Sequence, residues 1–154
     1  MTYQPGEIIL HKYRIEELIG RGAFAEVYRV THLELNVPRA LKVLHREAPG
    51  VGSTEFSDFQ GRFQLEAQLG AKLNSPTPHP NLLQVHDFHK DGDQLFLEME
   101  FAPGGSLAQR ITASRESGEP ISIDDAIRIG IDIAAGLAEL HNLDVVHRDL
   151  KPSN

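Results

Sequence analysis

The chain has 154 residues, of which 40% are hydrophobic, and it carries a formal net charge of −7. This length fits one ordinary domain or part of a larger one, and the acidic balance argues against nucleic acid or an anionic membrane as the main partner, because both need a basic face. Cysteine is absent, which excludes disulfides and thiolate metal sites. No apolar run approaches the roughly 18 uncharged residues of a membrane span, and no signal-peptide pattern opens the chain, so we expect a soluble, cytoplasmic protein.

The first predicted elements are two strands joined by a glycine-bearing loop. Ile8 to Ile19 mixes Ile, Leu and Tyr with charges, the loop spans Gly20 to Val27, and Tyr28 to Thr31 resumes β-favouring residues. Such a loop lets backbone N–H groups approach phosphates, although a plain hairpin explains an isolated G-x-G about equally well. Strand-like sequence on both sides argues against a dinucleotide fold, which places its glycines between a strand and a helix.

A short strand with a lysine on its apolar face comes next. Leu33 to Pro38 predicts a turn, and Arg39 to Leu44 predicts a strand in which Ala40, Lys42 and Leu44 share one face. Taken alone, this lysine is best explained by snorkelling at a sheet edge. Beside a glycine loop, a phosphate-binding lysine is the better interpretation.

A helix follows the first strands. The segment from His45 to Gly61 predicts a loop, with the helix beginning near Ser57 or Asp58. Apolar residues then recur at helical spacing, and Glu66 lies near their side of the helix. Most helical glutamates are ordinary surface carboxylates, but this one is a candidate partner for the Lys42 ammonium.

Prolines between positions 76 and 80 end this helix. Leu82 to Phe88 and Gln94 to Phe101 then predict two strands joined by a polar turn. His86 and His89 would point to opposite faces of the first of them, so we expect no metal site there. Ala102 to Gly105 breaks the pattern and is expected to link two lobes.

The second half predicts helices. Ser106 to Ser114 indicates a short helix, followed by a polar loop from Arg115 to Pro120. Ser122, three residues before Asp125, predicts the cap of a second helix that runs to about Leu143. Apolar residues on more than one face are typical of a helix buried on several sides. Because few residues follow it, we expect this helix to belong to a larger helical domain and to expose an apolar patch prone to aggregation.

The segment from His147 to Asn154 brings one carboxylate, one amide and two cations into one turn. Such a density of polar groups beside apolar sequence is costly unless a site uses it. Asp149 could accept a proton or orient a hydroxyl, Lys151 could neutralise charge on a transferring phosphoryl group, and Asn154 could offer oxygen to a hard cation. This segment is therefore the candidate catalytic site.

Taken in order, these motifs resemble a eukaryotic-type Ser/Thr protein kinase of the group also found in bacteria. The resemblance covers nearly the whole chain and implies an α+β, bilobal protein-kinase-like fold. Residues 1–101 would form the ATP-binding N-lobe, residues 102–105 the hinge, and residues 106–154 the truncated start of a helical C-lobe. The matching elements are the glycine-rich loop (Gly20 to Val27), the lysine strand (Arg39 to Lys42), the αC glutamate (Glu66), the turn before the fourth strand (His79 to Asn81), the gatekeeper and hinge (Glu98 to Ala102) and the catalytic loop (His147 to Asn154).

The resemblance also implies roles for individual residues in binding ATP and Mg²⁺. Lys42, held by Glu66, would bind the α- and β-phosphates under the glycine loop. Asp149 would orient a substrate hydroxyl and accept its proton, Lys151 would steady the γ-phosphoryl group, and Asn154 would hold one magnesium ion. The remaining nucleotide-site residues implied are Ile19, Gly20, Gly22, Val27 and Ala40, with Met99 at the back and hinge backbone at Glu100 and Ala102.

The resemblance also implies protein substrates with Ser or Thr rather than Tyr acceptors, because Lys151 is followed by Pro152 and Ser153. Arg148 resembles the arginine that pairs with a phosphorylated activation loop, and His147 resembles a packed, structural histidine. Substrate identity, activating signal and oligomeric state are left open.

Two departures from the family pattern stand out. The third glycine of the loop is Ala25, a modest change, and the 154 residues contain no D-F-G, activation loop or A-P-E segment. The 154-residue chain alone is therefore expected to be inactive, since the principal magnesium ligand is missing. The alternatives are a small-molecule phosphotransferase of kinase-like fold and an ATP-binding pseudokinase or regulatory fragment. The Arg148 and Lys151 pattern favours protein substrates. An inherited pseudokinase is disfavoured because four residues are all intact: Lys42, Glu66, Asp149 and Asn154.

Overall fold

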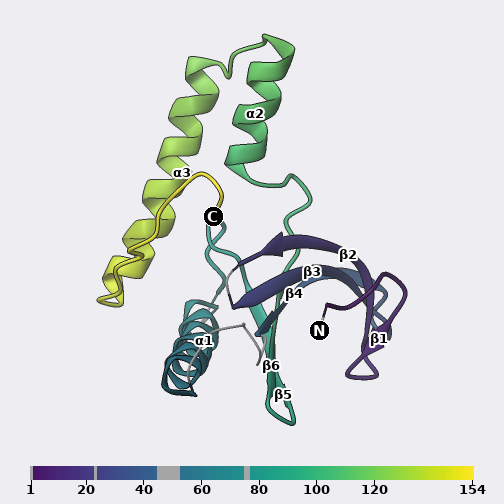
Figure 1. Cartoon of the computed structure of the whole chain (residues 1–154). Helices are drawn as coiled ribbons and strands as arrows, with labels where there is room; N and C mark the ends of the chain where they lie inside the picture. Colours follow the sequence, from purple (N-terminus) through teal and green to yellow (C-terminus); the bar gives the residue numbers. More distant parts are fainter. Residues whose placement is uncertain (1, 23, 45–52, 75–76) are drawn as a thin grey trace. The chain divides into compact units, whose positions relative to one another are not determined.

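The computed structural model describes residues 2–22, 24–44, 53–74 and 77–154. It divides into two compact units, one formed by residues 1–75 and 83–101 and the other by residues 76–82 and 102–154. The elements, in chain order, are β1 (Ile8–Ile9), β2 (Tyr13–Arg21), β3 (Ala25–His32), β4 (Val37–Leu44), α1 (Ser53–Leu73), β5 (Val85–Asp91), β6 (Gln94–Glu100), α2 (Leu107–Ser117) and α3 (Ile123–Asn142) (Figure 1).

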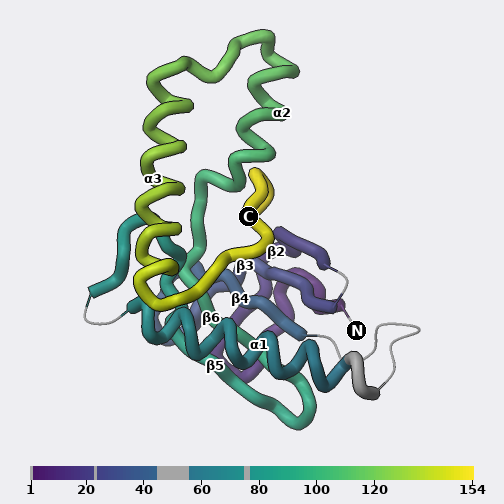
Figure 2. Tube along the Cα trace, turned by 90° about the vertical axis from the view of Figure 1, so that its left-hand side faces the viewer, coloured from purple at the N-terminus to yellow at the C-terminus, as the bar shows by residue number. Residues whose placement is uncertain are grey.

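The first unit is built on one six-stranded antiparallel sheet in the order β1-β2-β3-β4-β6-β5. Neighbouring strands in the sheet are also neighbours in sequence, except that β4 pairs with β6 and leaves β5 at the edge. Helix α1 lies between β4 and β5 in the sequence and beside the sheet in both views (Figures 1 and 2).

The two faces of this sheet carry separate hydrophobic clusters, because successive residues of a strand point to opposite sides. Phe63 and Ala67 of α1 pack with Leu44, Leu95 and Leu97 on one face. The other face is covered by the N-terminal segment. Its buried cluster consists of Ile9, Tyr13, Ile15, Tyr28, Val30, Leu41, Val43 and Phe96, with Tyr3 and Leu10 packed against it.

The loop predicted from Gly20 to Val27 is shorter in the structure. The β2–β3 ladder continues through the pair Arg21↔Glu26, so strand structure takes up both ends of the predicted loop. The turn predicted from Leu33 to Pro38 also ends earlier than expected, since Pro38 pairs with Thr31 near the start of β4. A proline is tolerated close to the beginning of a strand, where it removes little of the ladder.

Helix α1 begins at Ser53 and not near Ser57 or Asp58, so the loop prediction was wrong for its second half. Residues 45–52 of that predicted loop lie outside the described residues. Gly61 inside a helix costs roughly 0.5–1 kcal/mol relative to Ala. Packing of the α1 phenylalanines, including Phe59 and Phe63, against the sheet offsets that cost.

The β5–β6 hairpin was predicted, but the first strand is displaced along the chain. β5 begins at Val85 rather than Leu82 and continues to Asp91, opposite Gln94. Gly92, in the turn, has a φ of +57°, a conformation that glycine adopts at little cost. The second strand ends at Glu100, one residue before its predicted end.

The second unit contains the two predicted helices, and the predicted cap of the second one, Ser122, is present. The Ser106 side chain accepts a bond from Gln109 N, forming a capping box, and Ser122 accepts one from Asp125 N at 3.1 Å. α2 extends to Ser117, three residues beyond the prediction, because the left-handed cap is supplied by Gly118.

The apolar residues of α3 divide between a packed and an exposed side. Gly136 lies against the chain before β5, where an added Cβ would come within 2.9 Å of the Asn81 carbonyl oxygen. Ile123, Ile127 and Ile131 are exposed by 79%, 56% and 62%. The predicted apolar exposure of this helix is therefore present. Within the described residues, the helices are all too short or too polar to span a membrane.

Candidate active site

The predicted contact between Lys42 and Glu66 is present. Lys42 Nζ lies 2.7 Å from Glu66 Oε1 and 2.6 Å from Oε2, and 5.6 Å from the centre of the Phe63 ring. The two side chains are 26% and 46% exposed, so the pair contributes at most about 1 kcal/mol to stability. The pair matters more for geometry than for stability, because Glu66 holds the Lys42 ammonium at one place on the α1-covered face of the sheet.

Strand register places three other predicted residues on the same face as Lys42. Val27 pairs with Lys42 itself, and Ala40, two positions earlier on β4, pairs with Met99 of β6. Ile19 is 43% exposed and precedes Gly20 at a shift in the β2–β3 register. The ammonium therefore lies beside a small apolar surface.

The glycines of the loop are not required by packing. A Cβ added at Gly20 would meet Val27 at 3.5 Å, and one added at Gly22 would meet the Ala25 carbonyl oxygen at 3.4 Å, both ordinary contacts. The loop is closed by a bond of 2.8 Å from Gly22 N to that same oxygen. Among the described residues, the space around both glycines therefore accommodates a side chain.

The end of β6 presents backbone groups at the edge of the first unit. Glu100 N donates to Gln84 O at 2.8 Å, so this N–H is already bonded within the chain. The Phe101 ring lies 5.2 Å from the Arg29 guanidinium. In the second unit, the Ala102 carbonyl accepts a bond from Gly105 N at 3.4 Å.

The second unit brings Asp149, Lys151 and Asn154 together in a single turn. Lys151 Nζ lies 2.8 Å from Asp149 Oδ2, and Asn154 Nδ2 donates to the same oxygen at 3.0 Å and to Asp149 O at 2.7 Å. The bond from Lys151 and, to a smaller extent, the bond from Asn154 lower the pKa of the Asp149 carboxyl below its ordinary value. The group is therefore an ionised acceptor at neutral pH.

Three features of this turn were not predicted. Pro152 O accepts a hydrogen bond of 2.8 Å from Ala108 N, which lies in the first turn of α2 and therefore has no acceptor within the helix. This bond anchors the segment. No pattern in the sequence signals this contact. His147, which resembles a packed histidine, is instead exposed, and its Nδ1 lies 3.3 Å from Asp149 N. Arg148 has a φ of +61°, a strained conformation for this residue type.

A third group of polar side chains lies on the opposite face of the sheet. Ligand atoms of Asp87, His89 and Glu98 lie within 4.8 Å of one another. Lys12 Nζ lies 3.4 Å from Asp87 and 3.7 Å from Glu98, and Arg39 lies 3.1 Å from Glu98. Because these cations already neutralise the carboxylates, the group is better explained as an ion-pair network than as a metal site.

Comparison with known proteins relates both units to one family. A model of the protein kinase domain matches residues 13–154. Serine/threonine-protein kinase pkn3 of Myxococcus xanthus is 38% identical over 152 residues, covering 97% of this chain and 25% of that protein. Serine/threonine-protein kinase PrkC of Bacillus subtilis is 31% identical over 149 residues, covering 97% of this chain and 21% of that protein.

A solved structure extends the likeness to the fold. The crystal structure of a mutant PknI kinase domain of Mycobacterium tuberculosis matches with a TM-score of 0.74 at 28% identity, covering all of this chain and 57% of that one. The chain spans about a quarter or less of the length of these two curated relatives.

Proposed function

The chain belongs to the protein kinase family, and from that premise we propose that it is the nucleotide-binding and catalytic-loop part of a Ser/Thr protein kinase. The reaction proposed is transfer of the γ-phosphoryl group of ATP to serine or threonine hydroxyls of proteins. Residues 1–101 serve as the ATP-binding lobe, 102–105 as the hinge and 106–154 as the start of the helical lobe. The observation that carries the proposal is the Lys42 ammonium between both oxygens of Glu66, on the face that also bears Val27 and Ala40.

Nucleotide binding is assigned to the first unit with the hinge. Adenine packs on Ile19, Val27 and Ala40, with Met99 behind it and the backbone of Glu100 and Ala102 along its edge. The α- and β-phosphates meet Lys42 and the N–H groups of the glycine loop. The support is the common face of Val27, Ala40 and Lys42, which sets an apolar surface beside a fixed cation.

Phosphoryl transfer is assigned to the Asp149 turn. Asp149 orients the acceptor hydroxyl and takes its proton as the oxygen bonds to the γ-phosphorus and the bond to the β-phosphate oxygen breaks, releasing ADP. Lys151 neutralises charge on the transferring group. The lowered pKa of Asp149 supports an orienting role more than that of a strong base.

The donor set of this turn also suits Mg²⁺. The Asn154 amide nitrogen is engaged by Asp149, so the amide oxygen is the atom that suits a hard cation. Mg²⁺, when bound, would neutralise part of the negative charge of the phosphates. Asn154 would hold it, and Asp149 fixes the orientation of the Asn154 side chain.

The proposal is tested by comparing the binding of Mg-ATP to wild type and to Lys42→Ala. Thermal shift and titration calorimetry measure the binding. We expect wild type to bind and the variant to lose at least about tenfold in affinity, because the charged contact with the phosphates is removed. The matched control is Lys90→Ala, an exposed lysine of β5, which is expected to bind as wild type. Equal affinity of Lys42→Ala and wild type would contradict the assigned site.

A further inference from the structure

The buried carboxylate of Glu26 lies at the start of the strand that follows the glycine loop, and it has no role in the proposed reaction. Glu26 is the second residue of β3 and is 5% exposed. A buried carboxylate is costly unless it is paired and hydrogen-bonded. Its partners therefore indicate what it does.

The contacts of Glu26 with described residues come from two directions. Arg21, which stands between Gly20 and Gly22, places Nη2 2.9 Å from Glu26 Oε1 and is its cross-strand neighbour. From the other direction, Thr2 Oγ1 donates to Oε1 at 3.2 Å, and the Tyr28 hydroxyl donates to Oε2. One carboxylate thus joins the glycine loop to the beginning of the chain.

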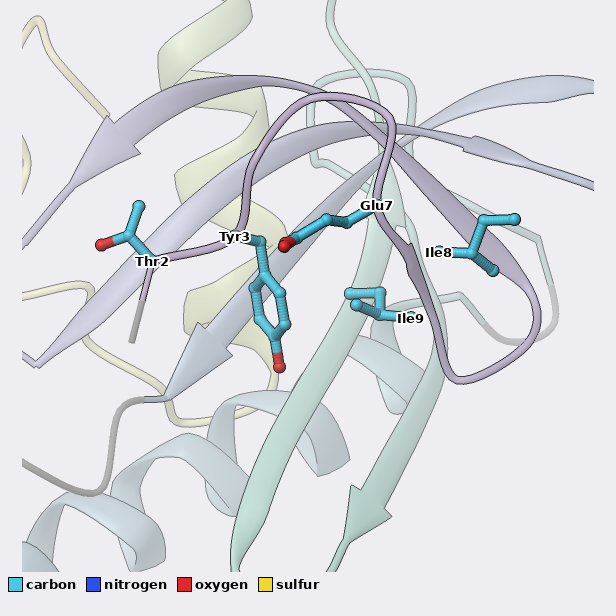
Figure 3. A pocket seen from close by; sticks show the side chains of 5 residues that line it. All are labelled: Thr2, Tyr3, Glu7, Ile8 and Ile9. Atoms are coloured by element: carbon cyan, nitrogen blue, oxygen red, sulfur yellow. The ribbon is translucent and has the colours of Figure 1, made fainter.

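The beginning of the chain is itself fastened to the sheet; we call residues 2–9 the N-terminal strap. Tyr3 N donates to Tyr28 Oη at 3.1 Å, and the two rings meet edge to face with centroids 5.8 Å apart. Tyr3 Oη donates to Gln94 Oε1 at 2.8 Å, across the sheet on β6. Figure 3 shows the strap curling back on itself, with the Glu7 side chain pointing towards Tyr3. The hollow it surrounds is lined by Thr2, Tyr3, Glu7, Ile8 and Ile9.

Glu26 acts from the face of the sheet opposite the nucleotide. Glu26 and Tyr28 share the buried, strap-covered face of β3, whereas Val27 between them points to the face of Lys42. Glu26 therefore cannot contact a ligand bound beside Lys42. Any influence on binding passes through the backbone of the glycine hairpin.

We propose that Glu26 is a positioning residue for the glycine-rich loop, and that it fastens Arg21 of that loop to the N-terminal strap. A loop held in place before binding loses less conformational entropy when it closes over phosphates, so the strap raises nucleotide affinity without touching the nucleotide. This inference rests on the proposed function for its ligand, but the contacts that carry it are independent of ATP.

The first test measures loop order without any nucleotide. Hydrogen exchange of the amides of residues 20–22 and 25 is compared in wild type, Arg21→Ala and Thr2→Val. We expect both substitutions to accelerate this exchange, since each removes one side of the Glu26 connection. The matched control is Arg14→Ala. Arg14 is another ion-paired arginine of β2: its Nη2 lies 3.0 Å from Glu16 Oε1, away from the glycines. Unchanged exchange in both variants would overturn the inference, whether or not the chain binds ATP.

The second test is a double-mutant cycle on the dissociation constant for Mg-ADP. Arg21→Ala and Glu26→Gln are each expected to weaken binding roughly three- to tenfold, and the double variant no further, because both break the same contact. Arg14→Ala is expected to bind as wild type. If Glu26→Gln does not fold, Thr2→Val replaces it in the cycle.

Two results of the cycle would overturn the inference. If Arg21→Ala weakens binding by the same factor in the Glu26→Gln background as in wild type, Arg21 contacts the nucleotide itself. If both single variants bind as tightly as wild type, Glu26 only stabilises the fold. Failure of wild type to bind Mg-ADP contradicts the proposed function instead, and the exchange experiment then decides on the strap.

Discussion

Asp149 shows how neighbouring side chains set the chemistry of one residue. Lys151 and Asn154 both contact its Oδ2, and these contacts hold the pKa of the carboxyl below its ordinary value. The folded state therefore favours the ionised form. The associated stabilisation is present above the ordinary pKa of an aspartate and is lost as the pH falls through the lower, folded value. At neutral pH the group is ionised with or without its partners.

The residue-scale prediction is that Lys151→Ala raises the pKa of Asp149 towards its ordinary value, because the largest cause of the shift is removed. Titration of the ¹³C-labelled carboxyl by NMR measures this directly. Lys90→Ala serves as the matched control and is expected to leave the titration unchanged. An Asp149 pKa that is the same in Lys151→Ala and wild type would show that the ammonium of Lys151 is not what lowers it.

Helix α1 illustrates how packing distinguishes two glycines within one element. A Cβ added at Gly70 would come within 2.2 Å of Val85 Cγ2 on β5, whereas nothing lies within 4 Å of one added at Gly61. Gly70 therefore permits a close approach between α1 and β5, and Gly61 only weakens the helix. Since α1 carries Glu66, its seating on the sheet determines whether that carboxylate meets Lys42.

The element-scale prediction compares Gly70→Ala with Gly61→Ala. Gly70→Ala is expected to lower the free energy of unfolding by about 1–3 kcal/mol, since the extra methyl group overpacks the contact with Val85. Gly61→Ala is expected to raise it by roughly 0.5–1 kcal/mol through better helix propensity. Urea unfolding followed by circular dichroism measures both. A stabilised Gly70→Ala variant would show that the helix can move away without loss.

At the scale of the whole molecule, the two halves of the proposed chemistry belong to different units. The Lys42–Glu66 pair lies in the first unit, and Asp149, Lys151 and Asn154 lie in the second. The second unit exposes Ile123, Ile127 and Ile131 on α3. Within the 154 residues, no D-F-G sequence supplies the aspartate that binds magnesium in the family.

The whole-molecule prediction is that the 154-residue chain binds Mg-ATP but does not phosphorylate a generic protein substrate. Binding requires the first unit and hinge, whereas transfer also requires a complete set of magnesium ligands. Incorporation of γ-labelled phosphate is compared in wild type and Asp149→Asn. Incorporation by wild type that is lost in Asp149→Asn would prove the prediction wrong.

Local signals were sufficient to predict much of the fold. The cap at Ser122, the β5–β6 hairpin and the shared face of Ala40 and Lys42 were predicted from neighbouring residues, because their physical causes act within a few positions. The order of the motifs, from Gly20 to Asn154, indicated the family that the comparisons then showed. The roles assigned to individual site residues stay predictions until binding and transfer are measured.

What depended on tertiary structure involves residues far apart in the chain. Helix α1 starts at Ser53, and Phe56 and Phe59 near its beginning pack against a cluster formed with residues of β4 and β6, which lie far away in the sequence. Similarly, nothing near Glu26 in sequence indicates that Thr2 reaches its carboxylate, or that Pro152 caps a donor at Ala108. Composition and periodicity determine which segments become strands and helices. Which side chains meet depends on the register and long-range packing of the folded chain, because distant contacts leave no periodic pattern in a single sequence.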